Sequence, residues 1–133
     1  MTPFKLRIMT PEKTFFNGET TQIIAKTTTG NVGVLHGHVP YVANLVSSPF
    51  MIEVEGTLKE AAISGGFIKV SPEDVVVVTN AIEWAEDIDV ARAERSKQNA
   101  EERMKRHESQ KEFDRAEKKL KRALNRLIVA KKN

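Results

Sequence analysis

The last third of the chain decides the fold: residues 88–133 have the sequence IDVARAERSKQNAEERMKRHESQKEFDRAEKKLKRALNRLIVAKKN. This stretch contains no glycine and no proline, and alanine, glutamate, lysine, arginine and leucine dominate it. These five residue types have high intrinsic helix propensities, whereas glycine and proline interrupt helices. Residues 88–133 are therefore predicted to be helical, apart from one turn.

The turn is predicted at residues 105–110, which contain no large apolar side chain. Ser109 is a suitable N-cap for the second helix, because its hydroxyl can accept a hydrogen bond from the first helical turn. The first helix has only Ala93, Ala100 and Met104 on an apolar face, so the pairing of the two helices is predicted to be marginal. The second helix has a fuller stripe at spacings of three and four: Phe113, Ala116, Leu120, Ala123, Leu124, Leu127 and Ile128.

The first 86 residues have a different pattern, with short β-branched or alternating stretches between turn residues. Residues 4–8 alternate apolar and polar side chains, which is the period of a half-buried strand. Gly56-Thr57 and residues 71–74 are turn sequences between apolar stretches and predict hairpins. Asn17-Gly18 is predicted to interrupt a strand, and residues 75–78, four valines, to form a central strand covered on both faces.

The two patterns together predict an α+β protein. An N-terminal antiparallel β-sandwich occupies residues 1–86, and a C-terminal two-helix antiparallel hairpin occupies residues 87–133. A content of 40% hydrophobic and 29% charged residues is typical of a folded domain and not of a disordered chain. Without cysteine the chain has no disulfide or thiolate chemistry, and without a signal-like N-terminus it is expected in a reducing, cytosolic compartment.

Charge is distributed unevenly along the chain. Residues 1–86 carry six Lys/Arg against nine Asp/Glu, which gives −3, and in residues 87–110 six of each sign cancel. Residues 111–133 carry nine Lys/Arg against three Asp/Glu, which gives +6 and brings the whole chain to +3. Such an asymmetry predicts that the C-terminal helix meets an acidic partner, although a solvated helix face would have the same composition.

No sequence motif of an enzyme is present: there is no Walker phosphate loop, no nucleophile elbow and no zinc-protease motif. The glycines of residues 29–33 and 64–67 are interpreted as turn residues, because no helix follows them to receive an anion. His36 and His38 stand two apart, but a metal site needs a third ligand and only the distant His107 remains. We therefore predict no catalytic residue and no metal site.

Arginines on both helices offer a possible anion site. Arg122 and Arg126 are four residues apart on one face of the second helix, with Arg115 further back. When the hairpin folds, they can approach Arg92 of the first helix, and arginine is well suited to bidentate phosphate contacts. An ordinary surface ion pair between Asp89 and Arg92 is the simpler interpretation, and the residues taken alone favour it.

Four segments in order resemble the epsilon subunit of bacterial F-type ATP synthase, most of all those of thermophilic bacilli: GNVGVLHGHVPYVANL (residues 30–45), ISGGF (63–67), AEDIDVARA (85–93) and KRALNRL (121–127). The resemblance covers essentially the whole chain. It implies a non-catalytic central-stalk subunit, peripheral on the cytoplasmic face of the bacterial plasma membrane, that couples the catalytic head to the ring of c subunits.

The resemblance also implies partners and a switch. The sandwich is expected to sit on the gamma subunit and touch the c ring. The hairpin is expected to permit ATP hydrolysis when folded and to block it when extended towards the alpha and beta subunits. In the extended state the basic helix would meet an acidic segment of the beta subunit.

In the bacillus-type members the motif [I/L]-D-x-x-R-A binds ATP as a regulatory ligand that is not consumed, and this favours the folded hairpin. The motif is intact here, and the residues that the resemblance places at the ATP are Glu83, Ile88, Asp89, Arg92, Ala93, Arg122 and Arg126. One further arginine expected in the first helix falls at Asn99, which predicts weaker ATP binding. The resemblance leaves the magnesium requirement open.

Parts of the sequence are also compatible with three other functions. A nucleic-acid-binding hairpin would explain the basic helix, but residues 1–86 are acidic and the basic segment offers only Phe113 for stacking. A small nucleotide hydrolase would need a base and a phosphate loop, which the sequence lacks. A plain adaptor with an inert hairpin predicts no role for Arg92 and Arg126 beyond surface charge.

Overall fold

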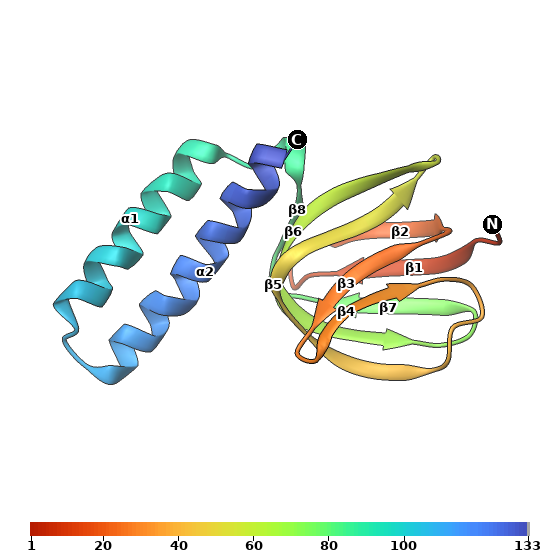
Figure 1. Ribbon diagram of the computed structural model, residues 1–133, viewed down its shortest axis with the longest axis horizontal. Helices are drawn as coiled ribbons and strands as arrows, with labels where there is room; N and C mark the ends of the chain where they lie inside the picture. Colours follow the sequence, from red (N-terminus) through yellow and green to blue (C-terminus); the bar gives the residue numbers. More distant parts are fainter. Residues whose placement is uncertain (133) are drawn as a thin grey trace. The chain divides into compact units, whose positions relative to one another are not determined.

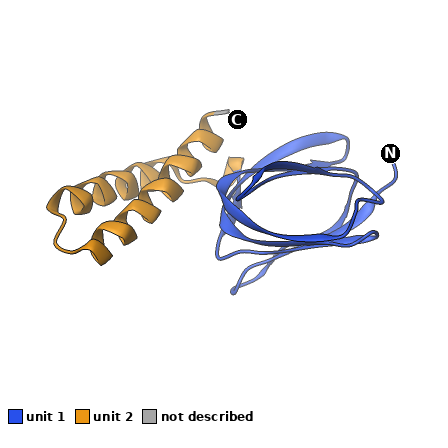
Figure 2. Ribbon diagram, turned by 60° about the horizontal axis from the view of Figure 1, so that its bottom comes forward, with its two compact units in different colours: residues 1–84 blue, residues 85–133 orange. Residues whose placement is uncertain are grey.

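The computed structural model describes residues 1–132, and the chain divides between Trp84 and Ala85 into two compact units (Figure 2). The first unit consists of strands and the second of helices (Figure 1). The predicted α+β class, with a β-sandwich followed by a two-helix hairpin, is confirmed.

The first unit has eight strands in one sheet that folds over on itself (Figures 1 and 2). The strand order is β2-β1-β7-β6-β5-β3-β4, and β8 pairs with β6. All neighbours are antiparallel except β1 and β7, which are parallel. The strands are β1 (Phe4–Met9), β2 (Thr14–Thr20), β3 (Ile23–Thr27), β4 (Gly30–Val34), β5 (Tyr41–Val54), β6 (Thr57–Val70), β7 (Asp74–Val78) and β8 (Ile82–Trp84).

The two longest strands, β5 and β6, have 14 residues each and form the central hairpin of the sheet. Their ladder is interrupted between the pairs Leu45–Gly66 and Ser47–Ser64. Gly66 has a φ of +126°, and a Cβ atom there would lie 2.2 Å from the carbonyl oxygen of Val78. Only glycine is compatible with this close approach of β6 and the end of β7.

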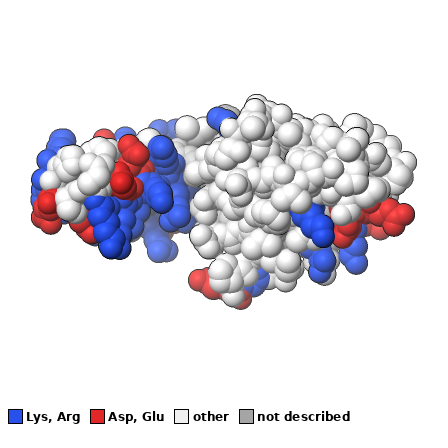
Figure 3. Space-filling view, turned by 90° about the horizontal axis from the view of Figure 1, so that it is seen from below, with Lys and Arg blue, Asp and Glu red and all other residues white. Residues whose placement is uncertain are grey.

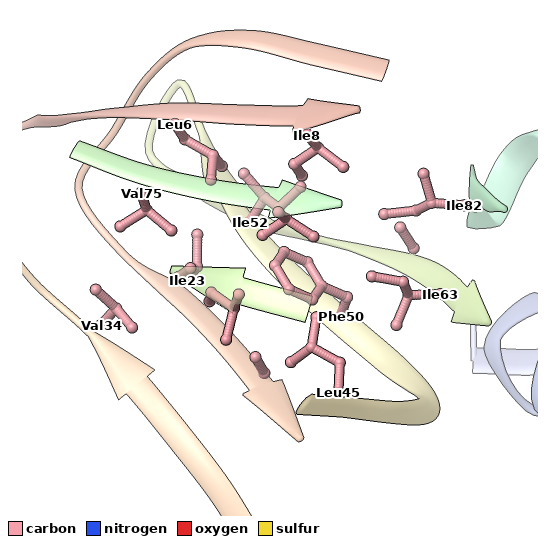
Figure 4. Packing of buried hydrophobic residues seen from close by; sticks show 14 of the residues in the cluster. Leu6, Ile8, Ile23, Val34, Leu45, Phe50, Ile52, Ile63, Val75 and Ile82 are labelled. Carbon is pink, nitrogen blue, oxygen red and sulfur yellow. The ribbon is translucent and has the colours of Figure 1, made fainter. Parts of the chain in front are cut away.

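The core of this unit lies between the two layers of the folded sheet (Figure 4). Inward-facing residues alternate with outward-facing ones along each strand, as the pleat of a sheet requires. In β1, for example, Leu6 and Ile8 are fully buried, whereas Lys5 and Arg7 are exposed. The largest buried side chains are Phe50, Leu6, Ile8, Ile23, Ile52, Ile63 and Ile68.

Two turn predictions are close to the structure. Residues 71–74 form the predicted β-turn, where the Ser71 N–H donates to the Asp74 carbonyl oxygen at 2.9 Å. The β5–β6 turn consists of Glu55 and Gly56, one residue earlier than predicted. Both have positive φ, 51° and 85°, as in the type I′ turns that match strand twist.

Two strand predictions are wrong. The four valines of β7 are not covered on both faces: Val75 and Val77 are buried, Val76 is half-buried, and Val78 is 46% exposed. Asn17 and Gly18 do not interrupt a strand, because they lie within β2 and pair with Arg7 and Leu6 of β1. Cross-strand pairing outweighs the local turn preference of these two residues.

The second unit contains a short 3₁₀ turn, η1 (Ala85–Asp87), and two helices, α1 (Val90–Arg106) and α2 (Gln110–Lys132). The helices lie side by side and run antiparallel (Figure 1), which confirms the predicted hairpin. The turn between them spans residues 107–109, inside the predicted range. None of the described helices is long and apolar enough to cross a membrane.

Candidate anion-binding site on the helical hairpin

The contact between α1 and α2 consists largely of alanines. Ala93 and Ala100 of α1 and Ala116 and Ala123 of α2 are each at most 2% exposed. Ala100 and Ala116 stand equally far from the turn, as do Ala93 and Ala123, so each pair lies at the same level of the antiparallel hairpin. Small side chains allow a close approach of the helices, but they bury little apolar area. The hairpin is therefore held by a narrow contact.

The turn is fixed by local interactions. His107 ends α1 in a left-handed conformation with a φ of 42°, and its N–H donates to the Arg103 carbonyl oxygen at 3.1 Å. Its ring stacks on Phe113, with 4.6 Å between the ring centroids. The Ser109 hydroxyl oxygen accepts a hydrogen bond from the Glu112 N–H at 3.1 Å, which confirms Ser109 as the N-cap of α2. These contacts set the point at which the chain reverses.

The residues of the IDVARA motif occupy the start of α1. Asp89 is the N-cap: its Oδ1 accepts a hydrogen bond from the Arg92 N–H at 3.0 Å. Ile88 is buried, and Ala93 is part of the alanine contact. Among the described residues no ion pair joins the Asp89 and Arg92 side chains, so the expected surface pair is replaced by a cap. The exposed Arg92 guanidinium is left available to a ligand.

A simple rule places the arginines on one side of the hairpin. Viewed from one end of the hairpin, the chain winds clockwise in one helix and anticlockwise in the other, and the contact residues of the two helices point in opposite directions. The opposite winding and the opposite direction compensate each other. Residues that directly precede contact positions therefore lie along the same edge of the pair in both helices. The residues before Ala93, Ala116, Ala123 and Leu127 are Arg92, Arg115, Arg122 and Arg126, which we call the basic flank.

Carboxylates follow the same contact positions and lie on the opposite edge. Glu94, Glu101 and Glu117 directly follow Ala93, Ala100 and Ala116. The sequence thus repeats as Arg-Ala-Glu at residues 92–94 and 115–117, with Asn-Ala-Glu at 99–101. On the basic flank, Arg115 has a local partner, the Glu112 carboxylate at 3.3 Å. Arg92 and Arg122 are exposed and Arg126 is half-buried. A row of cations with most of the flanking glutamates on the opposite edge is suited to a polyanion.

The structure thus brings six of the seven predicted ATP-binding residues into one unit. Ile88, Asp89, Arg92 and Ala93 lie at the start of α1, and the residues opposite this start in α2 include Arg122 and Arg126. Glu83 belongs to the other unit: it lies in β8, where it pairs with Ala62 of β6. The predicted ATP site remains a prediction, because the hairpin supplies the cations without showing what they bind.

The other candidates have structural roles. Gly30 and Gly33 lie in β4 and Gly65 and Gly66 in β6, so neither glycine stretch leads into a helix. The His38 ring makes an edge-on contact with Tyr41, with 5.5 Å between centroids. Within residues 1–132, no group of three or more His, Cys, Asp or Glu residues is placed to hold a metal ion.

Sequence reasoning missed two cations on the side of the basic flank, Arg103 and Lys119. They precede the half-buried Met104 and Leu120, so the rule that places Arg92 places them too. The signal was present in the sequence as a basic residue before each apolar contact position except Ala100. It becomes usable only when the register of the two helices is known, because helical spacing relates residues within one helix and not across two.

Comparison with known proteins matches both units. Residues 3–85 match the family model for the β-sandwich domain of the ATP synthase delta/epsilon chain. Residues 86–131 match the model for the long α-helix domain of the same chain.

Curated relatives match over nearly the full length. The chain is 56% identical over 133 residues to the ATP synthase epsilon chain of Ruminococcus albus, with 99% of each chain covered. It is 42% identical to the epsilon chain of Caldanaerobacter subterraneus, with 97% of this chain and 94% of that one covered. It is 39% identical to the epsilon chain of Bacillus mycoides, with 98% of each covered.

Solved structures show the same fold. A chain of the Euglena gracilis mitochondrial ATP synthase, in a structure of its OSCP, F1 and c ring, superposes with a TM-score of 0.82 at 21% identity. The match covers 100% of this chain and 83% of that one. A chain of the Tetrahymena thermophila mitochondrial ATP synthase central stalk and c ring gives a TM-score of 0.56 at 17% identity, covering 65% and 69%.

The alanine contact generates a stability prediction. Replacing Ala100 by leucine forces a larger side chain into the closed contact, which should cost about 1–3 kcal/mol and loosen the hairpin. Amide hydrogen exchange on the full chain should then show faster exchange throughout α1. Ala91→Leu is the matched control, because Ala91 is exposed on the same helix. Equal exchange in the two variants would show that the alanine contact does not hold the helices together.

Proposed function

This chain belongs to the ATP synthase delta/epsilon chain family, and we propose that it is a rotor subunit that regulates ATP hydrolysis through its hairpin. As a member of that family it is a subunit of the ATP synthase, and its proposed role in the complex is not catalytic. The observation that carries the regulatory proposal is the segregation of charge along a narrow alanine contact. We further propose a peripheral location on the cytoplasmic face of the bacterial plasma membrane, held through the complex.

The sandwich is proposed to dock on the gamma subunit and the c-subunit ring. An exposed apolar patch on its outer surface supports docking: Val42, Phe67 and Val78 are 57%, 39% and 46% exposed. Phe67 pairs with Val78, and Val42 pairs with Lys69 two residues along β6, so all lie on one face of the sheet. Figure 3 shows a largely uncharged upper part of this unit in that view, with Lys, Arg, Asp and Glu gathered along its lower edge. Exposed apolar side chains gathered on one face of a sheet are typical of an interaction site.

The hairpin is proposed to be the inhibitory element. Because the alanine contact is narrow, the free energy needed to open the hairpin is expected to be small. Two helices of 17 and 23 residues placed end to end would reach roughly 60 Å. In the extended state the basic α2 helix would contact an acidic segment of the beta subunit in the alpha/beta catalytic head and block hydrolysis. Folding of the hairpin would release that block.

ATP is proposed to hold the hairpin folded as a regulatory ligand that is not consumed. Its phosphates would neutralise Arg92 and Arg122, whose mutual repulsion otherwise opposes closure, and would contact Arg126. Ile88, Asp89 and Ala93 would form the rest of the site on α1, and Glu83 is proposed to contact the base or sugar. Asn99 is neutral, so the affinity is expected to be lower than with an arginine at that position.

Calorimetric titration of the full chain with ATP, with and without magnesium, tests the ligand. Saturable one-to-one binding is expected, and Arg92→Ala should weaken it about tenfold or more by removing a charge-assisted contact. Lys97→Ala removes one positive charge from the opposite side of α1, where Glu94 and Glu101 lie, and should change affinity little. If both variants weaken binding equally, general electrostatic attraction and not a defined site is responsible.

Removal of residues 88–133 tests the inhibition. In the reconstituted ATP synthase catalytic complex, the truncated chain should still assemble through its sandwich and should raise ATP hydrolysis, because the extended hairpin can no longer form. Hydrolysis is measured as phosphate release at limiting ATP, and assembly is checked by co-elution with the complex. Unchanged hydrolysis in a fully assembled complex would contradict inhibition by the hairpin.

A further inference from the structure

Lys119 lies on the same side of the hairpin as the basic flank. It directly precedes the half-buried Leu120, as Arg115 and Arg122 precede Ala116 and Ala123. Its own side chain is exposed. The four cations Arg115, Lys119, Arg122 and Arg126 therefore follow one edge of α2 at spacings of three and four residues.

The position along the hairpin places Lys119 opposite a neutral stretch of α1. Ala116 lies at the level of Ala100 and Ala123 at the level of Ala93, so Lys119 falls between these two levels. On the facing edge of α1, the residues between the two alanine levels that lie nearest the helix contact are Ser96 and Asn99, which carry no charge, and Arg95 lies further round the helix. A lysine side chain can extend over this stretch, because its flexible stem carries the ammonium well beyond the helix backbone.

The charge of Lys119 is not neutralised on its own helix. The residues four before and three after it are Arg115 and Arg122, and Ala116 and Ala123 complete its helical neighbours. In the described part of the chain, Lys119 makes no ion pair, whereas Lys121 lies 4.0 Å from the Glu117 carboxylate. Like charges at these spacings destabilise a helix. An anion that binds here therefore reduces the repulsion of Lys119 by Arg115 and Arg122.

We propose that Lys119 is a further phosphate ligand and that it binds the terminal phosphate of ATP. This inference rests on the proposed function, in which the nucleoside lies towards Ile88 and Asp89 and the phosphates extend along the basic flank. Lys119 lies seven residues before Arg126, a rise of about 10 Å, and its flexible side chain can cover the part of this distance that a triphosphate held at Arg126 does not span. Lys119 thus makes the hairpin selective for a triphosphate over a diphosphate, and it supplies the positive charge that Asn99 does not.

The experiment titrates the full chain with ATP, ADP and inorganic tripolyphosphate by calorimetry. Lys119→Gln should weaken ATP and tripolyphosphate binding about tenfold, as expected for loss of one charge-assisted contact, and ADP binding less than threefold. The preference for ATP over ADP should therefore collapse. Lys119→Arg should retain that preference, because it keeps a cation at the same place.

Lys121→Gln is the matched control: it removes the same charge two residues away, from the side chain that faces Glu117. Equal effects of Lys119→Gln and Lys121→Gln on ATP, or an unchanged ratio of ATP to ADP affinity, would overturn the role of Lys119. If the unmodified chain binds ATP and Arg92→Ala weakens this binding while Lys119→Gln does not, the proposed ATP site stands and the Lys119 inference fails. If the unmodified chain binds none of the three compounds, both are wrong.

Discussion

The structure of the hairpin depends on the contact between four alanines. Ala93, Ala100, Ala116 and Ala123 fix the register of α1 against α2, because each pair stands equally far from the turn. They also bring the helices close together while burying little apolar area, so the contact specifies a geometry without making it very stable. The residues that flank the alanine contact therefore determine whether the hairpin is closed.

Charged side chains flank the alanine contact, with arginines on one edge of the hairpin and glutamates on the other. Arginine precedes three of the four contact alanines and glutamate follows three of them. One edge therefore carries Arg92, Arg115 and Arg122, and the other carries Glu94, Glu101 and Glu117. In an antiparallel pair this arrangement places like charges opposite each other across the two helices, and closure brings them together. An anion on the basic flank removes that repulsion, and in our account this couples ATP to the conformation of the hairpin and hence to hydrolysis by the complex.

The sequence predicted those features that depend on near neighbours in the chain. Ser109 was identified as an N-cap and the turn at residues 71–74 was identified because local chemistry decides both. The exposure of Val78 and the pairing of Gly18 with Leu6 could not be predicted, since they depend on strands distant in sequence. Likewise, the spacing of Arg122 and Arg126 indicated one face of α2, but only the alanine register shows that Arg92 and Lys119 share that side.

The most direct test of the central claim is amide hydrogen exchange of the full chain with and without saturating ATP. The account predicts that, without ATP, α1 exchanges much faster than the core strand β7, because the alanine contact alone is weak. With ATP, protection of α1 and of the facing part of α2 should rise while that of β7 stays constant. Contradiction would come from an α1 helix as protected as β7 without any ligand, since closure would then need no neutralising anion.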